Sequence, residues 1–166
     1  MEKELLKIAS NLQKSIEDTF ANEPTGICYL TGFCMSEILN TMGYKTKKVT
    51  GKLALMYRNN KKYAVYGKLN GFRVGEYHTW CEVYVDGKTY IVDPSLKYNK
   101  KALTYFPEKI LLSKSIPDIL VTSENNTYNW KYIQEDSLEP LSLNFLQATP
   151  KKALEMVFSK ALENNI

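Results

Sequence analysis

Apolar residues recur every three or four positions in three stretches of the chain, which is the spacing of a helix with one buried face. Residues 2–20 form the first stretch and carry Leu5, Ile8, Ala9, Leu12, Ile16 and Phe20 on that face. Residues 28–42 form the second stretch, which ends before Gly43, a typical helix stop. Residues 150–163 form the third stretch and open with Pro150. The pattern therefore predicts three helices.

Other stretches have the composition and alternation of strands. Residues 47–66 are rich in Val, Leu and Tyr around the turn sequence Arg58–Lys61, and they predict two strands. Residues 79–92 predict a β-hairpin, because Asp86-Gly87 is a favoured two-residue turn. Residues 128–133 predict one more strand. Helices followed by an antiparallel sheet favour the α+β class, with the second helix packed on the sheet.

Size and charge narrow the classes of function. With 166 residues, of which 44% are apolar, the chain can bury one core, and we expect a single domain over residues 1–166. The net charge is +4, the lysines stand in short scattered groups, and arginine occurs only at Arg58 and Arg73. A nucleic-acid face needs a denser basic patch, so we expect no nucleic-acid partner. The oligomeric state stays open.

The sequence also gives no reason to expect a membrane-spanning segment, a metal site or disulfide bonds. The chain has no run of about 18 apolar residues that would span a bilayer, and residues 1–4 lack the pattern that opens a signal peptide. Three cysteines cannot all pair within one chain, and Cys28, Cys34 and Cys81 with a single histidine match no zinc pattern. These features predict a cytoplasmic protein with no metal or organic cofactor.

Cys28 is the candidate nucleophile. It follows Gly26-Ile27 at the predicted start of a helix, where free N–H groups and the helix dipole stabilise a thiolate. Most free cysteines are small buried side chains, and we interpret Cys34, in mid-helix, and Cys81, in mid-strand, in that way. His78 is the only histidine, so an imidazole base acting near neutral pH has to be this residue.

The predicted hairpin brings His78 together with an acid. With Asp86-Gly87 as the turn, Trp80 lies opposite Asp93. The same register sets His78 opposite Ser95. Because side chains alternate along a strand, His78 and Asp93 share one face and are diagonal neighbours. Such an aspartate fixes the imidazole tautomer and leaves the other ring nitrogen to face a thiol. A bulge in the hairpin would break this register.

Two runs of the sequence resemble the transglutaminase-like superfamily. The first is GICYLTGFCMSEILNTMGYKTKKVTG, residues 26–51, which is similar to the nucleophile helix and following strand of that superfamily. The second is HTWCEVYVDGKTYIVDPS, residues 78–95, which is similar to its His-x-Trp-x-Glu-Val and Asp-Pro segments. The two runs stand in the order found in the superfamily, and the resemblance covers roughly residues 24–96.

The resemblance implies a papain-like α+β fold in a single transglutaminase-like catalytic domain. It assigns Cys28 as nucleophile, His78 as base and Asp93 as orienting acid. The backbone N–H of Cys28 is the expected first donor to the oxyanion, and Gln13 is the candidate for the second. Trp80 either walls the site or fills the core, and we favour the core.

A triad of this kind predicts acyl transfer through a thioester on Cys28. The resemblance favours a hydrolase, a peptidase or amidase that acts on peptide or side-chain amide bonds of a peptide or protein substrate. A protein-glutamine transglutaminase or other acyltransferase is the alternative, as is an inactive binding module that keeps the triad as a relic. An arylamine-type acyltransferase would require an acyl-CoA pocket. The glycine-rich residues 67–75 are either one lip and lid of the cleft or an ordinary flexible connection.

Overall fold

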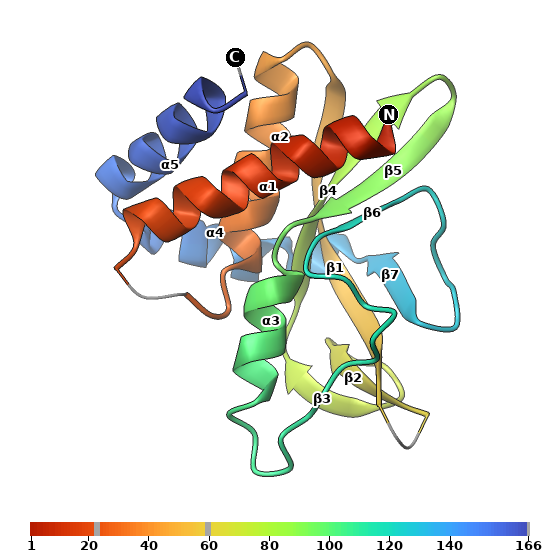
Figure 1. Ribbon diagram of the computed structural model, residues 1–166. Helices are drawn as coiled ribbons and strands as arrows, with labels where there is room; N and C mark the ends of the chain where they lie inside the picture. Colours follow the sequence, from red (N-terminus) through yellow and green to blue (C-terminus); the bar gives the residue numbers. More distant parts are fainter. Residues whose placement is uncertain (22–23, 59–60, 166) are drawn as a thin grey trace.

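The computed structural model describes residues 1–21, 24–58 and 61–165, which form an α+β arrangement (Figure 1). The helices are α1 (Glu2–Thr19), α2 (Cys28–Thr41), α3 (Leu96–Leu103), α4 (Glu139–Ala148) and α5 (Lys151–Glu163), with a short 3-10 helix η1 (Asp136–Leu138) before α4. The strands are β1 (Lys45–Tyr57), β2 (Lys62–Tyr66), β3 (Phe72–Gly75), β4 (His78–Val85), β5 (Lys88–Asp93), β6 (Leu120–Thr122) and β7 (Trp130–Gln134). The predicted α+β class is confirmed.

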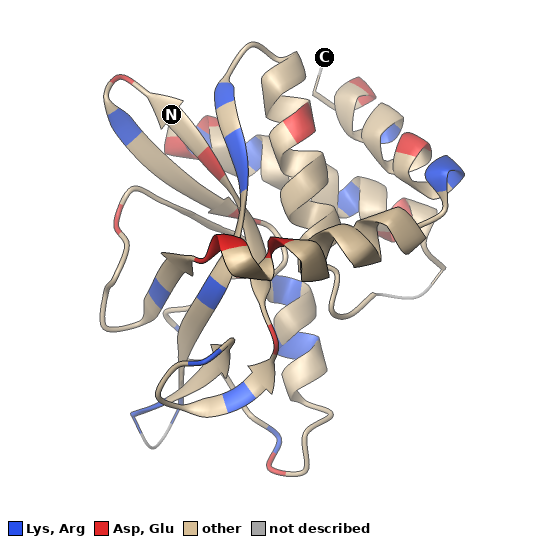
Figure 2. Ribbon diagram, turned by 180° about the vertical axis from the view of Figure 1, so that it is seen from behind, with Lys and Arg blue, Asp and Glu red and all other residues tan. Residues whose placement is uncertain are grey.

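Each of the three predicted helices is present, as α1, α2 and α5. The two strands predicted around Arg58–Lys61 are β1 and β2, which pair antiparallel. The middle of their connection, residues 59–60, lies outside the described residues. Positively and negatively charged residues are interspersed along the strands and helices in Figure 2. No described helix is long and apolar enough to cross a membrane.

The sheet has the strand order β3-β2-β1-β4-β5-β6, and β7 also pairs with β1. The prediction of an entirely antiparallel sheet is wrong, because β3 runs parallel to β2. The glycine-rich loop predicted for residues 67–75 is accordingly a tight return followed by a strand. Gly71 makes this return possible: its φ is +145°, and a Cβ there would lie 2.5 Å from the Tyr63 carbonyl oxygen.

The hairpin of β4 and β5 has the predicted register. Val85 pairs with Lys88, and the pairing continues without a shift to Cys81 and Val92. Asp86 and Gly87 have φ values of 49° and 75°, the positive angles that a two-residue turn of this type requires. Because no bulge interrupts the ladder, the side chains that follow it inward keep the predicted alternation.

Helix α2 lies between the sheet and the outer helices α1 and α5 (Figure 1). Apolar residues of α1 and α2 pack on the face of β4 and β5 that carries Cys81, Val83 and Val92. The closest approach is at Gly32 of α2, where a Cβ would stand 2.7 Å from the Thr79 side chain. This contact fixes α2 against the start of β4, which is where the candidate catalytic residues lie.

Helices α3 and α4 were not predicted. Helix α3 directly follows the hairpin and begins after Ser95. Helix α4 is held by two polar contacts: Thr79 donates to Ser142 over 3.1 Å, and Lys48 forms an ion pair with Glu139 at 2.6 Å. Together these helices supply two walls of the cavity described below.

We expect Gly51→Ala to lower the free energy of unfolding by several kcal/mol. Gly51 pairs with His78 on one side and with Gln134 on the other, and a Cβ there would lie 2.0 Å from the backbone oxygen of Ile133. Backbone cannot rotate away as a side chain does, so β7 must shift. Urea denaturation measures the loss. Gly87→Ala is the comparison, because its φ of +75° adds only about 1–2 kcal/mol of strain and its Cβ meets nothing within 4 Å. Equal losses would contradict the expectation.

Candidate active site

Cys28 is the first residue of α2 and is 6% exposed. Ile27 precedes it as the helix cap, and Gly26, with a φ of +67°, turns the chain into the helix. The first N–H groups of a helix have no acceptor within the helix and carry its positive dipole end. The structure therefore places Cys28 at the start of a helix, as the sequence predicts.

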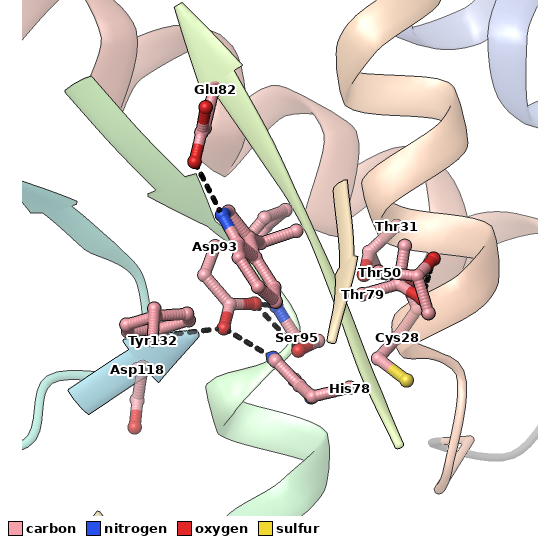
Figure 3. A network of polar contacts seen from close by, with 12 residues as sticks. Cys28, Thr31, Thr50, His78, Thr79, Glu82, Asp93, Ser95, Asp118 and Tyr132 are labelled. Atoms are coloured by element: carbon pink, nitrogen blue, oxygen red, sulfur yellow. Dashed lines mark hydrogen bonds and ion pairs between the residues drawn. The ribbon is translucent and has the colours of Figure 1, made fainter. Parts of the chain in front are cut away.

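His78 and Asp93 form a buried pair. The Nε2–H of His78 donates to Oδ2 of Asp93 over 2.7 Å, and both side chains are fully buried. Three further donors reach the same carboxylate: the Tyr132 hydroxyl at 2.8 Å, and the N–H and hydroxyl of Ser95 at 2.9 and 2.6 Å (Figure 3). Four hydrogen bonds thus fix the carboxylate, and the carboxylate fixes the imidazole ring.

The charges of this pair reinforce each other. Burial raises the pKa of Asp93, but the charge and hydrogen bond of His78, followed by the hydrogen bonds of Ser95 and Tyr132, lower it below its usual value. Burial lowers the pKa of His78, but the charge and hydrogen bond of Asp93, followed by the effect of the nearby Cys28, raise it to about 10. At neutral pH the pair is therefore an imidazolium and a carboxylate.

The other ring nitrogen of His78 is left for the thiol. Within the described part of the chain, Nδ1 is buried and has no hydrogen-bond partner. Cys28 is nevertheless close enough to raise the pKa of His78. Figure 3 shows Cys28 and Asp93 on either side of the imidazole. All three residues assigned to the triad are therefore brought together at one site.

A cavity of about 290 Å³ opens beside Cys28. Residues 74–77 form one side of the cavity. The end of the glycine-rich segment, residues 74–75, therefore lies where one lip of the cleft was predicted. The cavity is lined by Gly26, Cys28, Tyr66, Val74, Gly75, Glu76, Tyr77, Asn99, Ala102, Leu103, Phe106, Leu141 and Phe145. A nucleophile at the edge of a mainly apolar cavity is the usual arrangement of a small-molecule or peptide site.

The roles predicted for Gln13 and Trp80 can be compared with their positions in the structure. Gln13 does not line the cavity, and its side-chain amide donates to the Pro94 carbonyl over 2.8 Å, so its assignment as an oxyanion donor is wrong. Trp80 is 1% exposed and belongs to the core, as we favoured, and its ring stacks on His78 with centroids 6.3 Å apart. Cys34 and Cys81 are buried, and burial raises the pKa of both thiols above the usual value.

No protein-family model matches the chain, and no curated protein matches it. A solved structure described as "The crystal structure of genomics APC5867" is similar, with a TM-score of 0.56 and 14% sequence identity. The match covers 98% of this chain and 78% of that one. At this identity the similarity concerns the fold alone, and it supports the α+β architecture.

Tyr66 and Tyr77 were not singled out by the sequence, yet both line the cavity with Cys28. The ring of Tyr66 lies 5.3 Å from that of His78. Burial, followed by the electrostatic effect of Cys28, raises the pKa of both hydroxyls above the usual value. Both are therefore protonated donors at neutral pH. The only local signal was the position of Tyr77 next to His78, and Tyr66 carried none.

The described residues contain no group of three or more His, Cys, Asp or Glu side chains arranged to hold a metal ion. The nearest acidic groups are already engaged: Asp93 accepts four hydrogen bonds, and Glu76 forms an ion pair with Arg73.

Proposed function

We propose that this protein is a cysteine-dependent enzyme of the transglutaminase-like, papain-like kind, with Cys28, His78 and Asp93 as its triad. The observation that carries the proposal is the buried hydrogen bond of 2.7 Å from His78 Nε2 to Asp93, which leaves Nδ1 for a thiol at a helix start. A structural histidine gains nothing from a second buried nitrogen without a partner, whereas a catalytic one requires it.

In the proposed reaction the Cys28 thiolate attacks the carbonyl carbon of an amide, and the carbonyl electron pair moves onto oxygen. The oxyanion is stabilised by N–H groups at the start of α2. When the electron pair returns, the C–N bond breaks, and His78 donates its Nδ1 proton to the leaving amine. The acyl group stays on Cys28 as a thioester. Asp93 keeps the proton of Nε2 in place throughout.

Hydrolysis completes the proposed cycle. Water, deprotonated by the now neutral His78, attacks the thioester and releases a carboxylic acid and the thiolate. We favour a peptidase or amidase acting on peptide or side-chain amide bonds in the cytoplasm, as a single domain. An amine in place of water would make the protein a transglutaminase or acyltransferase. Incorporation of a fluorescent primary amine into a protein substrate distinguishes the two.

The first test is the reaction of Cys28 with iodoacetamide at about pH 6, followed by mass spectrometry. An ordinary thiol with a pKa near 8.5 is less than about 1% ionised at that pH. A thiolate paired with the His78 imidazolium reacts faster, and we expect His78→Ala to slow labelling of Cys28 about 10- to 100-fold. Cys34 and Cys81 are internal controls, because both are buried thiols whose pKa is raised. Equal, slow labelling of Cys28 in both proteins would favour an inactive binding module.

A further inference from the structure

The cavity beside Cys28 has the size of a side-chain pocket. Its volume is about 290 Å³, at the lower end of about 300–1,000 Å³ typical of ligand pockets. A dry cavity of about 150 Å³ is enough to hold benzene. One aromatic ring and the amide attached to it therefore fit, whereas a nucleotide-sized group does not.

The walls of the cavity are apolar on two sides. Helix α3 contributes Ala102 and Leu103, the segment after it contributes Phe106, and α4 contributes Leu141 and Phe145. Leu141 is 37% exposed and Phe145 is 55% exposed, although both line the cavity. Exposed apolar side chains gathered around a concave site indicate an apolar occupant that covers them.

The charges around the cavity exclude an acidic occupant. No lysine or arginine is among the described residues that line it. Its carboxylate, Glu76, forms an ion pair with Arg73, so the guanidinium at the rim is already neutralised and offers an acidic occupant no free counter-ion. An anionic side chain would enter without a counter-ion and beside a thiolate, which is costly in an apolar site.

Asn99 carries a hydrogen-bond donor at the cavity for which the described residues provide no acceptor. It lines the cavity from α3 and is only 2% exposed. Its side-chain Nδ2 is buried and, among the described residues, has no hydrogen-bond partner. Buried amide donors are almost always paired in folded proteins, and an unpaired one in a ligand cavity indicates that the ligand brings the acceptor.

We propose that this cavity binds a large apolar group of the acyl substrate, best an aromatic one, and that Asn99 donates a hydrogen bond to a carbonyl oxygen next to that group. The inference rests on the proposed function, because it takes Cys28 as the reacting atom. It names the substrate class as peptides or amides with an aromatic or large aliphatic residue on the acyl side of the cleaved bond.

The test compares N-benzyl iodoacetamide with N-carboxymethyl iodoacetamide as reagents for Cys28, with intact-protein mass spectrometry at several concentrations. Saturation gives a binding constant, KI, and a limiting rate, kinact. We expect KI to be at least about tenfold lower for the benzyl reagent, from burial of one aromatic ring. KI is measured at about pH 9, because an ordinary thiol is largely ionised there without help from a neighbouring base.

Leu141→Glu and Leu143→Glu form a matched pair. Both leucines lie in α4 and are 37% and 39% exposed, but only Leu141 lines the cavity. We expect Leu141→Glu to remove the preference for the benzyl reagent and Leu143→Glu to keep it. Asn99→Leu should raise KI for the benzyl reagent about two- to tenfold, the usual effect of losing a neutral hydrogen bond. Circular dichroism checks that each variant is folded.

The two proposals fail in different ways. If Cys28 is labelled slowly at about pH 6 and His78→Ala does not change the rate, the proposed function is overturned. That result concerns kinact, and the KI values measured at about pH 9 still report on binding in the cavity. Equal KI values for the two reagents overturn the inference, as do equal effects of Leu141→Glu and Leu143→Glu. If Asn99→Leu leaves KI for the benzyl reagent unchanged, the proposed hydrogen bond from Asn99 to the substrate is contradicted.

Discussion

Asp93→Asn should reduce the hydrolysis of p-nitrophenyl acetate by this protein about a thousandfold. In the native site the carboxylate accepts the Nε2–H of His78, so that in the proposed mechanism Nδ1 is the nitrogen that exchanges a proton with Cys28. An asparagine amide can donate to Nε2 instead, which moves the ring proton to Nδ1 and turns it toward the sulfur. A misplaced tautomer cannot accept the thiol proton, and base catalysis of this kind contributes about 10²–10⁴-fold. The rate of p-nitrophenol release measures the loss.

Asp118→Asn is the control for this prediction. Asp118 lies just before β6, which pairs with β5, but its side chain is 62% exposed and pairs with Lys100 at the surface. Removing a surface ion pair changes stability by about 1 kcal/mol or less, so the rate should stay within about twofold of the native protein. A folded Asp93→Asn protein that keeps more than a tenth of the native rate would show that His78 does not depend on Asp93, and would contradict the assignment of the triad.

The parts of the fold that the sequence predicts are those with a repeating local pattern. Helices α1, α2 and α5 each carry an apolar face at helical spacing, and the β4–β5 hairpin carries its own turn signal. Helix α4 lacks such a pattern, because Leu141, Leu143 and Phe145 alternate as in a strand and all remain partly exposed. Its position depends on contacts with distant residues, such as the ion pair of Glu139 with Lys48. Strand β3 is four residues long and is defined by its pairing with β2, so no local signal marks it.

In the candidate site, too, the contacts set by local sequence were predictable and those set by the tertiary fold were not. His78 and Asp93 were predictable as neighbours because 15 residues and one regular hairpin separate them. Tyr132 lies 39 residues beyond Asp93 on β7, and only the tertiary fold brings its hydroxyl to the carboxylate. Asn99 reaches the cavity because α3 follows the hairpin, and that helix was not predicted. Gln13 was misassigned for a related reason, since its amide serves the Pro94 carbonyl across the core.

The buried pair also links the stability of the protein to pH. The pKa of Asp93 is lowered in the folded state, so its contribution to stability is present above the unfolded pKa of about 4 and is lost as the pH falls through the lower folded value. The pKa of His78 is raised to about 10 in the folded state. Its contribution is complete below the unfolded pKa of about 6.5 and is lost as the pH rises through the folded value. The pair therefore stabilises the fold most between about pH 4 and pH 6.5.

We accordingly expect the free energy of unfolding to fall by about 3–5 kcal/mol between about pH 6.5 and pH 10, since each pKa unit of difference corresponds to about 1.4 kcal/mol. Lysines and tyrosines also titrate in this range, so the comparison is with His78→Gln, which keeps a donor for Asp93 but has no titrating ring. Urea denaturation at a series of pH values, under reducing conditions, should give a steep decline for the native protein and a much shallower one for the variant. The two curves should converge above about pH 10, because the native imidazole loses its charge as the pH rises through its folded pKa. Parallel curves would mean that His78 is uncharged in the folded protein at neutral pH, and that Nδ1 carries no proton for a leaving amine.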